Sequence, residues 1–164
     1  MQETILKISD FITSDNIFLG VSIKDKEGVL RFIADKCMKN GIVTDAEHIY
    51  NGLVEREESM STGVGLKMAF PHTTTPERDH AAVLVISLEN AIPYDSIDNA
   101  PVDTVFAIII PESNQTQHLQ ILARISRLCR NNEFMQCVRS TANPKKLKQE
   151  ITRLENEITE YLYK

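Results

Sequence analysis

The sequence predicts a single α/β domain in which helices cover both faces of a sheet. Two observations lead to this fold class. Segments whose apolar residues recur with a helical period alternate with short apolar segments rich in β-branched residues, which are typical of buried strands. The 164 residues contain no internal repeat, low-complexity tract or linker, and this length suits one domain with a sizeable core.

Two helices are expected in the N-terminal third of the chain. The first spans Asp25–Asn40 and is followed by Gly41, where a left-handed helix stop belongs. The second begins at Thr44, because Thr44-Asp-Ala-Glu47 has the pattern of a capping box, and it runs to about Glu58. The apolar face of the first helix consists of Val29, Leu30, Ile33, Ala34, Cys37 and Met38.

Strands are expected in the middle of the chain. Ser61–Phe70 begins with a glycine-containing turn and continues into a short strand that ends at Pro71. Ala81–Ser87 and Val102–Ile110 are apolar and β-branched, so both should be buried on both faces, and Pro111 stops the second one. The turn-rich segment 93–99 connects these two strands.

Two further helices are expected near the C-terminus. The first is Gln117–Arg130, whose three arginines we interpret as compensating the helix dipole, with a partner surface as the alternative. The second begins at Asn143-Pro144, an N-cap followed by proline at the first helical position. These arginines are Arg124, Arg127 and Arg130, and the apolar face of the last helix consists of Leu147, Ile151, Leu154, Ile158 and Leu162.

Composition and charge exclude several classes of protein. The chain carries 18 Lys and Arg against 23 Asp and Glu, a net charge of −5, so a surface for nucleic acid is not expected. The longest apolar runs, Ala81–Ile86 and Val105–Ile110, are far shorter than the roughly 18–20 residues that cross a bilayer. The first ten residues lack the basic and apolar regions of a signal peptide. Three cysteines without a paired spacing indicate a reduced, cytoplasmic chain.

His72 is the first candidate for chemistry. The apolar segment before it is expected to deliver the imidazole to the carboxyl end of a strand, where open α/β sheets usually place their sites. Pro71 stiffens the approach, because its ring fixes the backbone dihedral φ. The alternative is a histidine at a strand end whose ring hydrogen-bonds to a loop carbonyl.

His118 is the second candidate. It precedes Ile121 and Leu122 by three and four residues, so it faces the same side as the apolar face of its helix, in the first turn. Asn114 or Thr116 would cap this helix. A helix N-terminus disfavours imidazolium and favours a bound anion, so a neutral histidine beside an anion is expected. The alternative is a partly buried histidine that donates to a backbone carbonyl.

Other motifs give little support for a metal or a cofactor. His48 and His80 stand in polar surroundings and are expected at the surface, and no clustered His or Cys spacing suggests a metal site. Gly63-Val-Gly65 begins like a dinucleotide-binding fingerprint, but Met68 replaces the third glycine. The sequence also lacks a P-loop and a Gly-x-Ser-x-Gly elbow.

Three segments, taken in order, resemble the signature of a known family. They are Glu55-Arg-Glu57, Ser61-Thr-Gly-Val-Gly65 and Ala69-Phe-Pro-His72. Their order and spacing are similar to those of mannitol/fructose-type enzyme IIA domains of the bacterial phosphoenolpyruvate–sugar phosphotransferase system. Segments 93–111 and 118–123 look like the same family, and segment 97–103 is very similar to its nitrogen-regulatory branch.

The resemblance implies a phosphoryl carrier whose sheet is mixed parallel and antiparallel and is flanked by helices. His72 falls on the phosphorylated histidine of the family, His118 on its second active-site histidine and Arg56 on its active-site arginine. Thr62 and the backbone N–H of Gly63 are expected to be further phosphate donors. Residues 1–164 would form one such domain, with residues 152–164 as a C-terminal helical extension that inherits no role.

The same resemblance implies partners that dock over His72. An apolar rim is therefore expected around that ring, with Phe70, Met60 and Met68 as candidates, although a core position is equally open for Met68. Lys67 stands where the family usually has glycine, and it would add a cation near the site.

Three functions are compatible with these residues. A sugar carrier would take phosphate from the histidine phosphocarrier protein and pass it to a cysteine of a separate IIB domain. A regulatory module, as in the nitrogen-regulatory branch, would use phosphorylation of His72 to change which protein binds. An unrelated α/β enzyme would use His72 and His118 in acid–base catalysis.

Overall fold

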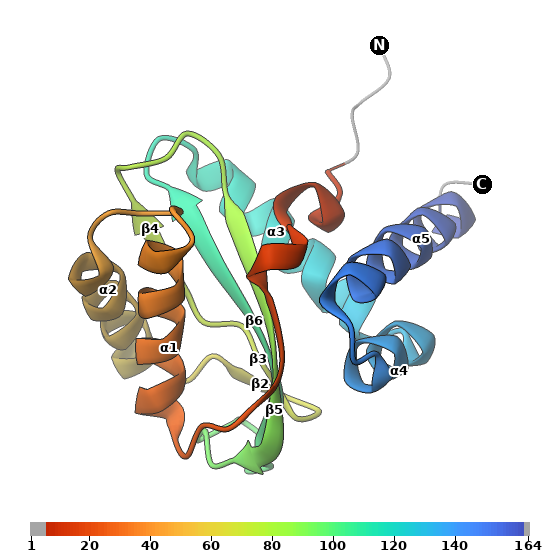
Figure 1. Ribbon diagram of the computed structural model, residues 1–164, viewed down its shortest axis with the longest axis horizontal. Coiled ribbons are helices and arrows are strands. Elements are labelled where there is room, and N and C mark those ends of the chain that lie inside the picture. Colours follow the sequence, from red (N-terminus) through yellow and green to blue (C-terminus); the bar gives the residue numbers. More distant parts are fainter. Residues whose placement is uncertain (1–5, 163–164) are drawn as a thin grey trace.

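A six-stranded mixed sheet forms the middle layer of the molecule in the computed structural model, which describes the backbone of residues 6–162 and the side chains of residues 6–160 (Figure 1). The parallel pairs are β1 (Ile17–Val21) with β5 (Ala82–Ile92), and both β3 (Met68–Ala69) and β4 (His72–Thr75) with β6 (Val102–Pro111). The antiparallel pairs are β5 with β6, and β2 (Gly63–Gly65) with β3. The predicted mixed α/β fold is thereby confirmed. The strands, in spatial order, are β1 (Ile17–Val21), β5 (Ala82–Ile92), β6 (Val102–Pro111), β3 (Met68–Ala69) and β2 (Gly63–Gly65), with β4 (His72–Thr75) also on β6.

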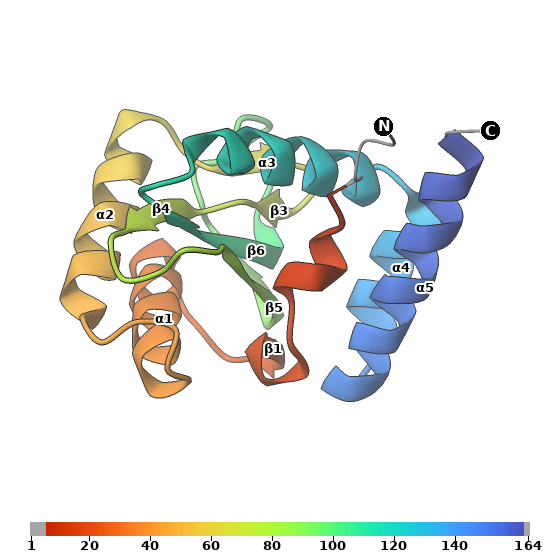
Figure 2. The same ribbon diagram turned by 90° about the horizontal axis from the view of Figure 1, so that it is seen from above.

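Helices cover both faces of this sheet, as Figures 1 and 2 show. On one face, α1 and α2 enclose one hydrophobic cluster; on the other, α3, α4 and α5 enclose a second cluster together with the short 3₁₀ segment η1. The helices are α1 (Lys26–Lys39), α2 (Ala46–Ser59), α3 (Gln115–Cys129), α4 (Asn132–Ser140) and α5 (Pro144–Leu162), and the 3₁₀ segments are η1 (Ile8–Phe11) and η2 (Ser14–Asn16). None of the described helices is long and apolar enough to cross a bilayer.

Strand β6 explains why two apolar layers can share one sheet. Successive side chains of a strand point to opposite faces, so its apolar run supplies both clusters in alternation. Phe106 and Ile108 lie in the cluster under α3, whereas Val105 and Ala107 lie in the cluster under α1 and α2. The prediction of strands buried on both faces is confirmed, although β5 extends beyond Ser87 to Ile92.

Two local predictions are wrong. The second helix is capped by Asp45, whose side chain accepts from the N–H of His48, and not by Thr44. Thr44 instead donates its hydroxyl and its N–H to Glu77, at 2.6 and 2.8 Å, so a contact with a distant loop takes the residue that the local pattern favours. The strand β1 has no counterpart among the predicted elements.

The region around Pro71 also differs from the prediction. Ala69 pairs with Val105 and His72 pairs with Ile108, so β3 and β4 keep one register along β6 on either side of the proline. Proline has no N–H to donate, which interrupts the ladder there. His72 is therefore the first residue of β4, which among the described strands pairs with β6 alone, and it is not at the carboxyl end of a strand as expected.

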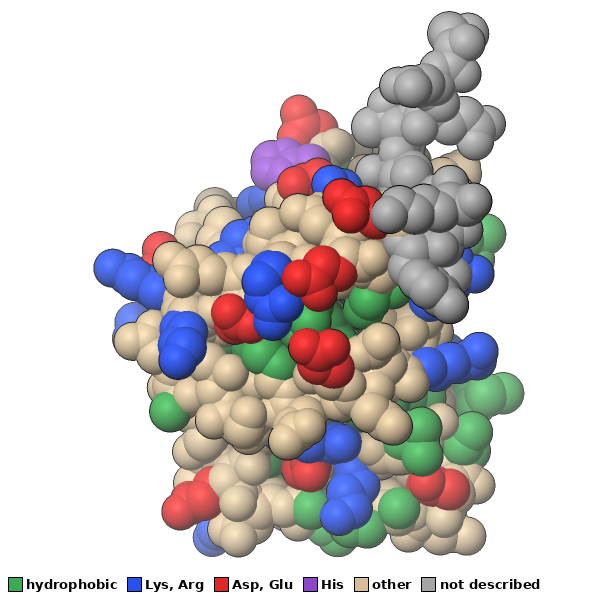
Figure 3. Space-filling model, turned by 90° about the vertical axis from the view of Figure 1, so that its right-hand side faces the viewer, with side chains coloured by type: hydrophobic (Ala, Val, Ile, Leu, Met, Phe, Trp, Pro, Cys, Tyr) green, Lys and Arg blue, Asp and Glu red, His purple; other side chains and the backbone are tan. Residues whose placement is uncertain are grey.

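The C-terminal helix is part of the packed structure. Leu147, Ile151 and Leu154 are buried as predicted, and the side chain of Leu162 lies outside the described part of the chain. Residues 1–5, which belong to the segment expected to lack a signal peptide, also lie outside it. Residues 152–162 continue α5 without a break. Acidic and basic side chains are interspersed over the side of the molecule that carries α5 (Figure 3).

The interpretation of the three arginines as compensating the helix dipole is wrong for Arg124, whereas Arg127 does lie in the last turn of α3. The side chain of Arg124 is buried, donates to Glu155 at 3.2 Å and bonds the hydroxyl of Thr159. Glu155 also accepts the N–H groups of Ile8 and Ser9, at 2.8 and 2.9 Å. A buried ion pair thus joins η1, α3 and the second half of α5.

Candidate functional site

His72 lies on the face of the sheet that α3 covers. It pairs in parallel with Ile108, and residues in register on neighbouring strands point to the same face, so the imidazole shares the side of the Ile108 cluster. The residue is only 8% exposed. Its Nδ1 lies 2.9 Å from the carbonyl oxygen of Phe70.

These contacts set the protonation of the ring. A carbonyl oxygen only accepts, so Nδ1 carries the hydrogen and donates it to Phe70, which leaves a lone pair on Nε2. Burial lowers the pKa of His72 below its usual 6.5, and the nearby His118 and Arg56 lower it further, against the opposing effect of the Phe70 hydrogen bond. At neutral pH the ring is therefore an uncharged nucleophile with its lone pair on Nε2.

Arg56 reaches this lone pair from the other side of the sheet. Its Nε donates to Nε2 of His72 at 3.1 Å, and its Nη1 donates to the carbonyl oxygen of Met60 at 2.9 Å, just past the end of α2. Gly52 lies one helical turn earlier on the same face, and a Cβ there would overlap the hydroxyl of Thr73. The absence of a side chain at Gly52 lets α2 lie against β4, so that Arg56 can reach the imidazole.

His118 approaches the same ring from the first turn of α3. Asn114 caps this helix by accepting from the N–H of Gln117, which confirms the predicted position of His118 in the helix. The ring centroids of His72 and His118 are 4.6 Å apart and the rings are tilted by 49°. Burial, and then the charge of Arg56, lower the pKa of His118. Its Nε2 is buried and has no hydrogen-bond partner within the described residues.

The structure thus brings His72, His118 and Arg56 together from three separate elements. A neutral imidazole lone pair, a permanently charged guanidinium and an imidazole nitrogen without a partner surround one small region. This combination suits an incoming group that is electrophilic at its centre and anionic at its edge, which describes a phosphoryl group. Among the described residues, no three His, Cys, Asp or Glu side chains come together as a metal site.

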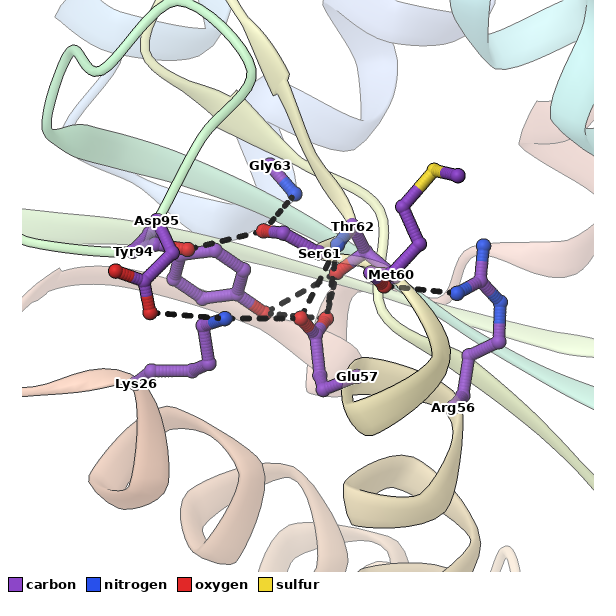
Figure 4. A network of polar contacts seen from close by, with 9 residues as sticks. All are labelled: Lys26, Arg56, Glu57, Met60, Ser61, Thr62, Gly63, Tyr94 and Asp95. Carbon is purple, nitrogen blue, oxygen red and sulfur yellow. Dashed lines mark hydrogen bonds and ion pairs between the residues drawn. The ribbon is translucent and has the colours of Figure 1, made fainter.

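Thr62 and Gly63 are engaged elsewhere. Thr62 donates both its N–H and its hydroxyl to Glu57, and the N–H of Gly63 donates to the hydroxyl of Ser61 at 3.1 Å (Figure 4). Their role as phosphate donors stays a prediction. The sequence interpretation missed Glu57 as a site residue, although its place in Glu55-Arg-Glu57, directly after Arg56, was a signal for it.

The expected surroundings of the ring are partly wrong. Phe70 and Met68 are buried in the core cluster under α3, whereas Met60 is 66% exposed beside Arg56. Leu119, next to His118, is 70% exposed and was not among the candidates. Lys67 lies in the turn between β2 and β3, and the next residue, Met68, is four register positions from His72 along β6, or about 13 Å, so Lys67 is not beside the ring. His48 and His80 are exposed, as expected.

Two relatives share sequence with most of the chain. A nitrogen regulatory protein of Bradyrhizobium diazoefficiens is 29% identical over 137 residues, covering 83% of this chain and 88% of that protein. The fructose-specific EIIABC component of Bacillus subtilis is 30% identical over 129 residues, or 79% of this chain. The match spans only 20% of that longer protein.

Solved structures share the fold. The nitrogen regulatory protein IIA-Ntr of Neisseria meningitidis superposes with a TM-score of 0.80 at 18% identity, covering 88% of this chain and 98% of that one. The mannitol enzyme IIA of Escherichia coli, solved in complex with phosphorylated mannitol enzyme IIB, gives a TM-score of 0.67 at 19% identity over 84% of this chain and 96% of that one.

The sequence model of one protein family matches most of the chain. The sequence model of the phosphoenolpyruvate-dependent sugar phosphotransferase system, EIIA 2, matches residues 10–154, which include Arg56, His72 and His118. Together with the mixed α/β fold, this match establishes that the chain belongs to the EIIA 2 family of the phosphoenolpyruvate-dependent sugar phosphotransferase system.

Proposed function

We propose that the protein is a cytoplasmic phosphoryl carrier that accepts a phosphoryl group on Nε2 of His72 from the histidine phosphocarrier protein and passes it to a cysteine of a IIB protein. One observation carries this proposal. The Nε2 lone pair of a buried, neutral His72 accepts from the guanidinium of Arg56, and the same ring lies against the ring of His118. Family membership and the mannitol IIA–IIB complex support the choice of partners.

The chemistry follows from the hydrogen bonds of the ring. As Nε2 forms a bond to phosphorus, the phosphorus–nitrogen bond of the donor phosphohistidine breaks and the donor ring keeps that electron pair. The His72 ring then gains positive charge, which the Phe70 carbonyl stabilises by accepting from Nδ1. When a cysteine thiolate takes the phosphoryl group, the electron pair returns to Nε2 and His72 is neutral again.

Arg56 and His118 act on the phosphoryl oxygens. Arg56 leaves the Nε2 lone pair and offers its planar N–H groups to the anionic oxygens, which are stronger acceptors than a neutral imidazole. His118 has a buried Nε2 without a protein partner, and that nitrogen donates to a third oxygen when it carries its hydrogen. Met60 and Leu119 expose large apolar side chains close in sequence to these two residues, and we assign both to the docking surface.

A second function has its own support. The nitrogen regulatory protein of B. diazoefficiens matches over 88% of its own length, without the further components of the B. subtilis EIIABC protein. In that case phosphorylated His72 would carry about −1.5 to −2 of charge on its phosphoryl group and change which protein binds at the same face. Both functions need the same phosphorylation and differ in what happens to the phosphoryl group afterwards.

The experiment is phosphorylation with phosphoenolpyruvate, enzyme I and the histidine phosphocarrier protein, followed by intact mass. Wild type and a His48→Ala control should gain one acid-labile phosphoryl group, whereas His72→Ala should gain none. Adding a IIB protein should then discharge the wild type if it is a sugar carrier, and a regulatory module would keep its phosphoryl group. An equal gain in His72→Ala would refute the assignment of the acceptor.

A further inference from the structure

Glu57 is adjacent to Arg56 on α2 but points into a different polar network, drawn in Figure 4. Successive helical residues are rotated by about 100°, so Arg56 faces the imidazole while Glu57 faces Tyr94 and the start of α1. The Glu57 side chain is only 6% exposed. Its carboxylate accepts from four donors: the N–H of Thr62 at 3.1 Å, the hydroxyl of Thr62, the hydroxyl of Tyr94 at 3.2 Å, and Nζ of Lys26 at 3.1 Å.

These donors suit a charged carboxylate. Lys26 provides a counter-charge and also lies 4.7 Å from the centre of the Tyr94 ring. Burial, and next the Glu57 charge, raise the pKa of Tyr94, so its hydroxyl keeps the hydrogen that it donates. A carboxylate has about four lone-pair directions, and here each of them has a donor. Glu57 is therefore held firmly, and it holds Thr62 in turn.

From Thr62, one chain of hydrogen bonds leads to Nδ1 of His72. The carbonyl of Thr62 accepts from the N–H of Phe70 at 3.0 Å, and the carbonyl of Phe70 accepts from Nδ1 of His72 at 2.9 Å. This route fixes the Phe70 peptide group and with it the acceptor that keeps the hydrogen on Nδ1.

A second chain leads to Nε2 of the same ring. Thr62 follows Met60, the C-cap residue of α2, by two residues, so this route begins along the covalent backbone and not with a hydrogen bond. The carbonyl of Met60 accepts from Nη1 of Arg56 at 2.9 Å, and Nε of Arg56 donates to Nε2 of His72 at 3.1 Å. The two nitrogens of the imidazole are thus both connected to one carboxylate that does not touch the ring.

We propose that Glu57 is a positioning residue which, through Thr62, sets the tautomer of His72 on one side and the approach of Arg56 on the other. This inference rests on the proposed role of His72 as phosphoryl acceptor. It also gives Thr62 a function other than direct contact with phosphate. Thr62 donates to Glu57, and its backbone connects Glu57 to the groups that hydrogen-bond to the His72 ring.

The test compares Glu57→Gln with Glu58→Gln, a matched change at the exposed neighbour. Glutamine keeps the shape and one acceptor oxygen but presents an NH₂ group to donors that need an acceptor. The nitrogen-15 shifts of the His72 ring in the unphosphorylated protein report the tautomer without any partner. Wild type and Glu58→Gln should show one Nδ1–H tautomer, and Glu57→Gln should show a mixture.

Transfer from the phosphocarrier protein gives a second readout. The single-turnover rate at saturating donor should fall about tenfold to a hundredfold in Glu57→Gln, since small displacements of reacting groups have effects of this size, while the donor concentration at half-saturation stays unchanged. Lys26→Met, which removes one donor and its charge but leaves the donors from Thr62 and Tyr94, should change both readouts in the same direction by less. A lower melting temperature in Glu57→Gln with an unchanged tautomer and rate would overturn the proposal. If wild type shows the single tautomer but accepts no phosphate, the proposed function fails while the positioning role of Glu57 stands.

Discussion

Nε of Arg56 lies 3.1 Å from Nε2 of His72 and donates to it, so in this state the guanidinium covers the lone pair that would attack phosphorus. The nucleophile is occupied by the group that is also expected to bind the phosphoryl oxygens. The arrival of a dianionic phosphoryl group offers Arg56 a better acceptor and uncovers Nε2 in the same movement. Arg56 would therefore orient the ring before transfer and stabilise the phosphoryl group during it.

Replacing Arg56 should slow phosphoryl transfer without removing the acceptor, His72. We expect Arg56→Ala to be phosphorylated still on His72, but about 10²–10³ times more slowly, the usual effect of losing one fixed donor to the transferred group. Rapid-quench measurements with the phosphorylated donor would give the rate. Arg153→Ala, on α5, is the control and should behave as wild type. Wild-type rates in Arg56→Ala would show that the guanidinium has no part in transfer.

The protonation of His72 should respond to pH in a defined direction. Because burial and neighbouring positive charge lower its pKa, the ring should stay neutral as the pH falls through 6.5 and should gain a proton only at more acidic values. Arg56→Ala removes one of the charges that lower this pKa, so its midpoint should move up. Titration of the ring proton shifts by NMR gives both midpoints. A wild-type midpoint at or above 6.5 would contradict the prediction.

The lowered pKa of His72 should also make the free energy of unfolding depend on pH. Below pH 6.5 the unfolded chain binds a proton at His72 that the folded protein still rejects, so the free energy of unfolding should decrease as the pH falls from 6.5 towards the folded-state pKa. His72→Gln should reduce this dependence in urea titrations. If the free energy of unfolding of His72→Gln depends on pH as strongly as that of wild type, other groups cause the dependence.

Gly52 should be intolerant of even a methyl group. Alanine usually stabilises a helix relative to glycine by about 0.5–1 kcal/mol, but here its Cβ would overlap the hydroxyl of Thr73. We expect Gly52→Ala to lower the free energy of unfolding by about 1–3 kcal/mol, and Thr73→Ala in addition to restore part of it. Urea denaturation would measure both. Asn51→Ala, at the exposed neighbouring residue, is the control. If Gly52→Ala is as stable as Asn51→Ala, α2 does not approach β4 closely at Gly52.

The buried pair of Arg124 and Glu155 should be important for stability. Glu155 is fully buried, so Glu155→Ala would leave Arg124 without its counter-charge and two backbone N–H groups without an acceptor, at a cost of about 3–5 kcal/mol. The double variant Arg124→Met/Glu155→Gln removes both charges and should recover part of the loss. Glu157→Ala, at the surface of the same helix, should change the free energy of unfolding by less than about 0.5 kcal/mol. Equal effects at positions 155 and 157 would contradict this assignment.

Much of the fold could be predicted because its signals are local. The continuous apolar run of β6, the start of α1 near Asp25 and the Asn114 cap of α3 each depend on residues close together in the sequence. The edge strand β1 lacks such a signal: it has five residues, and Gly20 within it has a φ of +65°. The cap of α2 was mispredicted because Glu77, thirty-three residues beyond Thr44, binds that residue.

For the site, the residue types could be predicted from the sequence, whereas a hydrogen bond from the His72 ring to a loop carbonyl was only the alternative to a chemical role. The order Arg56, Thr62, His72, His118 carries the resemblance to the family, and the Phe70 carbonyl that holds Nδ1 is only two residues from the ring. The tertiary structure was needed to show that Arg56 donates to Nε2, that the His118 ring lies against the same imidazole, and that Glu57 accepts from Thr62. The tautomer, the burial and the lowered pKa of His72 depend on groups that the packing of α2, β4 and α3 brings together. These groups are far apart in the sequence, so their contacts could not be predicted from it, whereas helical periodicity and short-range hydrogen bonds involve neighbouring residues.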